Sequence, residues 1–183
     1  MVDLKEIEQV KSDAELLYSE EEVEQAIDRL ATQITLDLEN TNPVVLCVLN
    51  GGIVITGKLL DRLPFLLELD SVHVTRYGGR TKGSDLRWLH KPNIDLQGRT
   101  VMLVDDILDE GYTLAAIRDY CLEKRAKDVR IGVLLDKHLP FSKPCRADYV
   151  GLECQNRYVF GCGMDYKGYL RNLAGIYACR ENG

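Results

Sequence analysis

The amino-acid sequence predicts an α/β fold in which a central, mainly parallel sheet is flanked by helices. Residues 100–104 and 129–135 are apolar runs typical of buried strands, and apolar positions between them recur with helical spacing. A strand, a helix and a second strand at this distance indicate a right-handed crossover between parallel strands. Residues 44–60 repeat the beginning of this arrangement, because an apolar strand pattern runs through Asn50-Gly51-Gly52 into a helical pattern.

Further elements follow from local patterns along the chain. Ser19 and Glu22 form a capping box at the start of a helix, and Pro43 follows the end of that helix. Its apolar residues recur at three- and four-residue spacing: Val23, Ala26, Ile27, Leu30, Ile34 and Leu38. Residues 72–77 are typical of another strand. Short extended stretches are expected at residues 86–89, 149–153, 158–160 and 175–179.

Residues 78–84 are polar and rich in glycine, which predicts either a connection between two hairpin strands or a mobile lid. The chain of 183 residues fits one domain, 1–183, that is large enough to bury a core. No internal repeat, low-complexity tract or linker indicates a second domain.

Charge and hydropathy exclude several classes of protein. The formal net charge of −6 argues against general nucleic-acid binding, which depends on basic surface. No apolar run approaches the ~20 residues needed to span a bilayer, and the first residues do not resemble a signal peptide. The six cysteines are scattered without a C-x-x-C pair, so we expect reduced thiols rather than a zinc site or a disulfide framework. These features predict a cytoplasmic protein.

The segment from Val104 to Thr113 carries the strongest indication of chemistry. Asp105 and Asp106 are expected at the carboxyl end of a buried strand, where ligands of parallel sheets bind. Adjacent carboxylates can accept hydrogen bonds from a vicinal diol or bind magnesium. The turn that follows enters a helix, whose unpaired N–H groups attract a phosphate. A diol site beside a phosphate site has the outline of a ribose 5-phosphate; an acidic surface turn in which Asp109 caps the helix is the alternative.

This segment resembles the phosphoribosyl-pyrophosphate (PRPP) binding motif of type I phosphoribosyltransferases. That motif has hydrophobic residues, two acidic residues, two hydrophobic residues, and then Asp, a variable residue, Gly, a variable residue and Thr. Further matches narrow the resemblance to the hypoxanthine–guanine branch and together cover about residues 40 to 180. They are residues 46–52, 134–137, 150–153, 161–166 and 171–173.

The resemblance implies roles for the matching acidic and phosphate-binding residues. Asp105 and Asp106 are expected to hold the ribose hydroxyls and, through water, a Mg²⁺ ion that Asp165 faces. Asp109 is expected near N7 of the purine as the general acid/base. The 5-phosphate is expected to be wrapped by Asp109, Glu110, Gly111, Tyr112 and Thr113. Asn50 and Gly51 occupy the pyrophosphate loop, where the family often has a strained peptide, and Arg171 is expected to contact pyrophosphate.

The purine site is implied by three further residues. Lys137 is expected to hydrogen-bond the exocyclic oxygen at position 6, Tyr158 to stack on the base, and the Val159 backbone to read the edge of the base. Lysine is only a donor, so it suits a carbonyl oxygen and not an amino group. It therefore favours 6-oxopurines over adenine, and Asp109 and Lys137 are the catalytic candidates.

Three residues depart from the family pattern. Glu110 stands where this branch often has Thr, and we expect its side chain to point outward so that only its N–H contributes. Asn50 stands where some relatives have a basic residue. Arg76, before Tyr77 in the mobile-loop motif, is bulkier than the usual small residue, and its charge is a candidate to compensate for Asn50 when the loop closes.

The resemblance implies a Mg²⁺-dependent transfer of the phosphoribosyl group of PRPP to N9 of hypoxanthine or guanine, giving IMP or GMP and pyrophosphate. It also implies a homodimer or homotetramer, and a small hood formed by about residues 1–40 and 150–183. Two alternatives stay open: a preference for xanthine, and a PRPP-sensing regulator that contacts nucleic acid. Such a regulator is expected to lack the purine-site Lys or Asp, whereas Lys137, Asp109 and Asp165 are all present.

Overall fold

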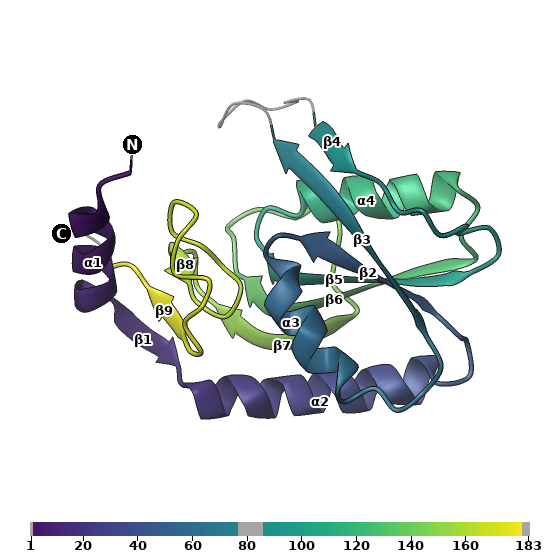
Figure 1. Ribbon diagram of the computed structural model, residues 1–183, viewed down its shortest axis with the longest axis horizontal. Helices are drawn as coiled ribbons and strands as arrows, with labels where there is room; N and C mark the ends of the chain where they lie inside the picture. The colour runs from purple at the N-terminus through teal and green to yellow at the C-terminus, as the bar shows by residue number, and fades with distance from the viewer. Residues whose placement is uncertain (1, 77–85, 181–183) are drawn as a thin grey trace.

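The structure is a computed structural model that describes residues 2–76 and 86–180, and its main layer is a six-stranded sheet (Figure 1). The strands lie in the order β4-β3-β2-β5-β6-β7, and every neighbouring pair is parallel except the antiparallel pair β3 and β4. Their bounds are Val44–Leu49 (β2), Glu68–Arg76 (β3), Leu86–His90 (β4), Thr100–Leu108 (β5), Asp128–Lys137 (β6) and Tyr149–Cys154 (β7). The predicted α/β class with a mainly parallel sheet is confirmed.

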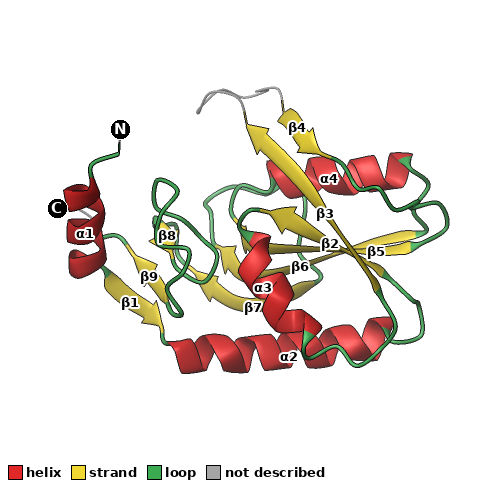
Figure 2. Cartoon of the chain, viewed as in Figure 1, coloured by secondary structure: helices red, strands yellow, loops and turns green. Residues whose placement is uncertain are grey.

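Helices cover both faces of this sheet, as the parallel strands require. Helices α2 (Glu20–Leu38) and α3 (Gly52–Leu60) pack against one face, and α4 (Tyr112–Glu123) packs against the other (Figure 2). The predicted capping box at the start of α2 is present: the backbone N–H of Glu22 donates to the Ser19 hydroxyl, and the Glu22 carboxylate accepts from the Ser19 backbone N–H. Every apolar residue predicted for the inner stripe of α2 is buried.

Two element boundaries differ from the sequence prediction at the place where the site forms. Strand β5 continues to Leu108, so Asp105 and Asp106 lie within the strand and not after it. The reason is pairing with β6, because Ile107 and Leu108 align with Leu135 and Asp136 of that strand. Helix α4 begins at Tyr112, two residues before Leu114, where the apolar helical pattern in the sequence begins. The turn between β5 and α4 is therefore only three residues long, from Asp109 to Gly111.

A second sheet is built from segments near both ends of the chain. It has three antiparallel strands in the order β1 (Glu15–Tyr18), β9 (Ile176–Ala178) and β8 (Val159–Phe160). Helix α1 (Leu4–Asp13) precedes it, and neither α1 nor β1 was predicted. Within the segments proposed for the hood, α2 and β7 pack with the main sheet, whereas the small sheet stands beside it (Figure 1). Among the described residues, no helix is both long and apolar enough to cross a membrane.

Helix α3 approaches strand β5 closely at Gly52. A Cβ atom at Gly52 would lie 2.5 Å from the backbone carbonyl oxygen of Val104, a distance that no side chain tolerates. At Gly57, one and a half turns later on the exposed side of α3, a Cβ atom would meet nothing within 4 Å. Close packing therefore requires glycine at position 52 but not at position 57, although both residues lie in one helix.

We expect Gly52→Ala to lower the free energy of unfolding by about 2 kcal/mol or more, because α3 must move away from β5. Gly57→Ala is the matched control and should raise the free energy of unfolding by about 0.5 to 1 kcal/mol, since alanine favours the helix. Urea denaturation of the two variants measures both changes. Equal effects at the two positions would contradict the close approach.

Candidate active site

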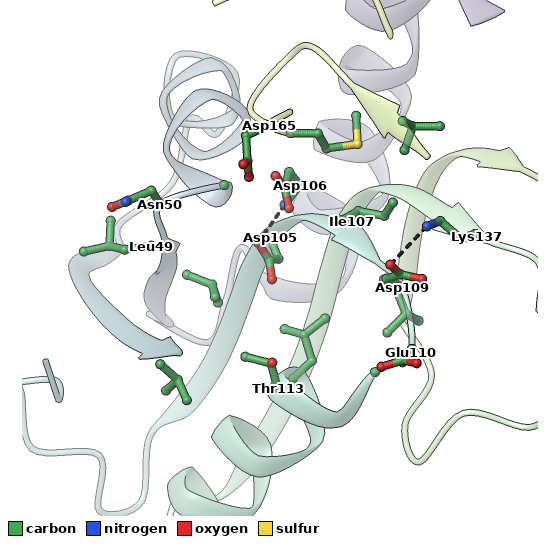
Figure 3. Close-up of a pocket in the computed structure, with 18 of the residues that line it drawn as sticks. Leu49, Asn50, Asp105, Asp106, Ile107, Asp109, Glu110, Thr113, Lys137 and Asp165 are labelled. Atoms are coloured by element: carbon green, nitrogen blue, oxygen red, sulfur yellow. Dashed lines mark hydrogen bonds and ion pairs between the residues drawn. The ribbon is translucent and has the colours of Figure 1, made fainter. Parts of the chain in front are cut away.

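A pocket of about 420 Å³ opens at the carboxyl ends of strands β2, β5 and β6, where parallel sheets bind ligands (Figure 3). The sheet supplies the floor, and the loops around β8 supply the opposite wall. The predicted residues that line it are Asn50, Gly51, Asp105, Asp106, Asp109, Glu110, Gly111, Thr113, Lys137, Tyr158, Val159, Asp165 and Arg171. One cavity thus brings together residues that lie up to about 120 positions apart in the chain.

Asp105 and Asp106 lie in the last part of β5, and Asp106 is only 6% exposed. The backbone N–H of Asp106 donates to the Asp105 carboxylate at 2.9 Å. Burial raises the pKa of Asp105 well above the ordinary value, and the Asp106 charge raises it further. Burial also raises the pKa of Asp106, although the hydrogen bond with Asp105 and the charge of Arg171 oppose this. Two carboxylates held in this way favour a bound cation or donor between them.

Glycines leave the space that the Asp106 carboxylate occupies. A Cβ atom at Gly51 would lie 2.1 Å from Oδ2 of Asp106, so only glycine fits at the amino end of α3. Gly163 has a φ of +102°, and a Cβ atom there would lie 2.4 Å from the carbonyl oxygen of Gly51. Three segments therefore converge on Asp106: the turn after β2, the end of β5 and the loop after β8.

Asp165 and Arg171 belong to the loop after β8 and hold each other. The Arg171 guanidinium lies 2.6 Å from Oδ1 of Asp165 and 3.9 Å from Oδ2 of Asp106. It also donates to the carbonyl oxygen of Gly163 at 2.5 Å. The other oxygen of Asp165 accepts a hydrogen bond from the backbone N–H of Gly168 at 2.7 Å. Both side chains are about one-third exposed, so they can still contact a ligand.

The turn after β5 ends at the amino terminus of α4. Gly111 is the N-cap residue and has a φ of +83°, a conformation that favours glycine. Gly111 has no side chain to cap the helix, and the first N–H groups of a helix attract an anion. The hydroxyl of Thr113 lies in the same turn and lines the pocket. This end of α4 is suited to a phosphate group.

Asp109 and Lys137 form a pair on one side of the pocket, at the ends of β5 and β6 (Figure 3). The Lys137 ammonium donates to Oδ2 of Asp109 at 3.0 Å. The lysine side chain is 10% exposed and the aspartate side chain 48%. A buried lysine needs an acceptor, and Asp109 supplies it. The pair places a cationic donor and a carboxylate side by side, which suits a heterocycle with an oxygen and a ring nitrogen on neighbouring positions.

Tyr158 and Val159 also line the pocket. Val159 is buried in β8, whereas the Tyr158 ring is about half exposed and lies edge-to-face with Tyr166 at 5.4 Å. The Tyr166 hydroxyl donates to Glu6 of helix α1 at 2.8 Å, and the Lys167 ammonium lies 2.6 Å from the same carboxylate oxygen. Helix α1 is therefore linked to the loop that carries Asp165.

One predicted residue lies outside the pocket lining, and others lie outside the described residues. Tyr112 is the first residue of α4, and its half-exposed side chain does not line the cavity. Tyr77 and the lid proposed at residues 78–84 lie outside the described residues, and only the backbone of Arg76, the last residue of β3, is described. The peptide bond between Leu49 and Asn50 is cis. Sequence reasoning missed the apolar lining, which is formed by Val48, Leu49, Val74, Ile107, Leu108, Leu114 and Met164.

The charge of the lining is unfavourable for a bare anion. Among the lining residues, five carboxylates (Asp105, Asp106, Asp109, Glu110 and Asp165) outnumber two cations (Lys137 and Arg171). Within the described part of the chain, no three His, Cys, Asp or Glu side chains form a cage for a metal ion. A polyphosphate that binds here must therefore bring a cation, and its own phosphate oxygens must coordinate that cation.

Comparison with known proteins identifies a family. The model of the phosphoribosyl transferase domain matches residues 13–167. A hypoxanthine-guanine phosphoribosyltransferase of Streptococcus thermophilus is 32% identical over 167 residues, which are 91% of this chain and 93% of that protein. The bifunctional protein TilS/HprT of Listeria innocua is 36% identical over 159 residues, which are 86% of this chain. The chain spans about a quarter (24%) of the length of this second relative.

A solved structure agrees with these relatives. The crystal structure of a hypoxanthine phosphoribosyltransferase from Staphylococcus aureus superposes with a TM-score of 0.86. The two sequences are 27% identical, and the superposition covers 93% of this chain and 94% of that one.

We expect Asp105→Asn to raise the midpoint of thermal unfolding by a few degrees near pH 8 in the presence of a chelator. A carboxyl whose pKa is raised by folding is protonated at low pH, where the wild-type protein and the variant carry the same charge. The wild-type protein then loses stability as the pH rises through the raised pKa of the pair. The difference in melting midpoint should therefore be small in acid and grow with pH.

Asp61→Asn is the matched control, because Asp61 is an exposed aspartate at the end of α3. Its melting midpoint should follow that of the wild-type protein across the same pH series. An Asp105→Asn protein that is less stable than the wild type at every pH would show that burial of this pair is not costly.

Proposed function

Because the chain belongs to the phosphoribosyltransferase family, we propose that it transfers the phosphoribosyl group of PRPP to N9 of hypoxanthine or guanine, with release of pyrophosphate. The observation that carries this proposal is the convergence of three subsites in one pocket. They are the amino end of α4, the Asp105–Asp106 pair and the Lys137–Asp109 pair. In this order they match a phosphate, a ribose diol and a 6-oxopurine.

The 5-phosphate is proposed to bind the N–H groups at the start of α4 and the Thr113 hydroxyl. The ribose hydroxyls then reach Asp105 and Asp106, which are good acceptors because they are carboxylates. Arg171, Asn50 and Gly51 line the pocket near these carboxylates and are the candidates to receive pyrophosphate. The leaving group develops negative charge, and the Arg171 guanidinium stabilises it electrostatically.

Magnesium fits this site when PRPP supplies part of its coordination. Mg²⁺ is commonly held by one or two carboxylates together with phosphate oxygens and water, and Asp105, Asp106 and Asp165 offer oxygens of the right kind. The raised pKa values of Asp105 and Asp106 show that burial of their charges is unfavourable without a counter-charge. The bound ion is expected to neutralise the pyrophosphate and so to make it a better leaving group.

The Lys137–Asp109 pair is proposed to select and activate the purine. The Lys137 ammonium donates to the oxygen at position 6, and adenine would place an amino group there and leave the donor unpaired. Asp109 is then free to hydrogen-bond N7 and hold its proton as general acid/base. Tyr158 is proposed to cover the face of the base, and the Val159 backbone to contact its edge.

The cellular setting is also proposed. All six cysteines are free thiols, and five of them are buried, which agrees with a reducing cytoplasm. A homodimer or homotetramer is the expected assembly, and light scattering after size-exclusion chromatography measures it directly.

A steady-state assay with PRPP and Mg²⁺ tests the reaction. We expect product from hypoxanthine or guanine and at least about 100-fold lower kcat/KM with adenine, because a buried donor is left unpaired. Xanthine, assayed alongside, decides the open question of base preference. Binding of PRPP without turnover of any base would overturn the proposal and favour the regulator.

Asp109→Asn tests the acid/base role. The amide keeps the shape of the side chain but cannot exchange a proton at N7, so kcat should fall about 100-fold or more while the affinity for PRPP changes little. Asp61→Asn, the same substitution at the exposed aspartate at the end of α3, is the matched control and should retain the turnover. Equal losses of kcat and PRPP affinity in the Asp109 variant would argue for a binding role instead.

A further inference from the structure

The turn between β5 and α4 (residues 109–111), proposed above to bind the 5-phosphate and called the phosphate turn below, is contacted from behind by Lys143. The Lys143 ammonium donates to the backbone carbonyl oxygen of Leu108 at 2.7 Å and to the Asp136 carboxylate at 2.5 Å. The lysine side chain is only 13% exposed. Leu108 is the last residue of β5, and the proposed phosphate turn begins immediately after it. Lys143 therefore holds the point at which the strand becomes the turn.

Cys145 makes a second contact two residues later. Its thiol lies 3.3 Å from the carbonyl oxygen of Gly111, which also accepts from the backbone N–H of Ala115 at 2.9 Å. The side chains of Lys143, Cys145 and Leu108 lie within 3.4 Å of the position that a Cβ atom on Gly111 would take. The segment 143–145 is thus packed directly against the back of the turn.

These contacts orient the peptide groups of the turn. In a trans peptide the C=O and the following N–H point in opposite directions. The carbonyl of Leu108 points back to Lys143, so the N–H of Asp109 points away from Lys143. The carbonyl of Gly111 points back to Cys145 and Ala115, so the N–H of Tyr112 points away from them. Donors for an anion are thereby presented without any side chain.

Two lysine–aspartate pairs brace the ends of β5 and β6 on opposite faces. Asp136 and Lys137 are successive strand residues, so their side chains point to opposite sides of the sheet. Lys137 pairs with Asp109 inside the pocket, and Asp136 pairs with Lys143 behind it. The proposed reaction requires the pair inside the pocket to open toward the purine. Neither residue of the pair behind it lines the pocket, so this pair can stay closed.

We propose that Lys143 is a positioning residue for the 5-phosphate, because it fixes the turn between β5 and α4 so that the backbone N–H groups converge on that phosphate. This inference rests on the proposed function and adds a residue that does not itself touch the substrate. It assigns to Lys143 a contribution to the ribose 5-phosphate half of PRPP. The pyrophosphate half, at Arg171 and Asn50, is independent of it.

Isothermal titration calorimetry with Mg²⁺ tests this division on the full chain, with PRPP, ribose 5-phosphate and pyrophosphate as separate probes. Lys143→Met should weaken PRPP and ribose 5-phosphate binding by about tenfold or more, since a charged hydrogen bond to the turn is lost. Pyrophosphate should bind the variant within about twofold of the wild type. Lys127→Met is the matched control, because it removes an exposed lysine that precedes the opposite end of β6.

A double variant, Asp136→Asn with Lys143→Met, separates positioning from a general loss of stability. It leaves no unpaired charge behind the turn and should melt closer to the wild type than Lys143→Met does. Its affinity for ribose 5-phosphate should nevertheless stay low, because the Leu108 carbonyl has still lost its donor.

Three outcomes would overturn the inference. They are unchanged ribose 5-phosphate binding by Lys143→Met, an equal loss for pyrophosphate, and recovery of ribose 5-phosphate affinity in the double variant. A folded wild-type chain that binds neither PRPP nor ribose 5-phosphate would refute the proposed function itself, and the inference with it. The wild-type titration thus distinguishes the two failures.

Discussion

The crowding of two carboxylates at the end of one strand is the constraint on which the rest of the site depends. Ionisation of both Asp105 and Asp106 in a buried position is energetically unfavourable. The surrounding structure answers this in several ways: glycine at 51 and at 163 gives the Asp106 carboxylate room, and Arg171 lies near it. The negative charge that these groups leave uncompensated gives the site an affinity for a cation. The buried carboxylate pair therefore lowers the free energy of unfolding of the ligand-free protein. Binding of a cation relieves the repulsion and is favoured by the same amount.

The pocket joins two kinds of support. The main sheet provides the groups whose positions must be reproducible, because β5 and β6 are paired along their length and covered on both faces. The segments on either side of β8 provide Tyr158, Asp165 and Arg171, which are more exposed and are held by loop contacts. The turn between β5 and α4 is neither part of the paired sheet nor a long exposed loop. It is short and depends on contacts from behind, so a small number of buried polar groups determines its shape.

Much of this arrangement could be predicted from the sequence, and the failures have a common cause. Strand β2 and helix α2 were predictable because their apolar patterns and the Ser19–Glu22 capping box are local. The end of β5 was placed too early because pairing with β6, and not local preference, extends it. Strand β1 exists only because it pairs with β9 near the other end of the chain. Lys143 lies thirty-five residues from the carbonyl that it holds, and no local pattern marks such a contact.

The link between helix α1 and the loop after β8 has a practical consequence for anyone who shortens the chain. Glu6 accepts hydrogen bonds from Tyr166 and Lys167, and the Tyr166 ring packs against Tyr158. A truncated protein that began at the first strand would retain every residue that lines the pocket. It would nevertheless lose the contacts of Glu6 with Tyr166 and Lys167, and with them a support of the Tyr158 ring that lines the pocket. Boundaries drawn from the pocket-lining residues alone would thus remove a helix that supports one wall of the pocket.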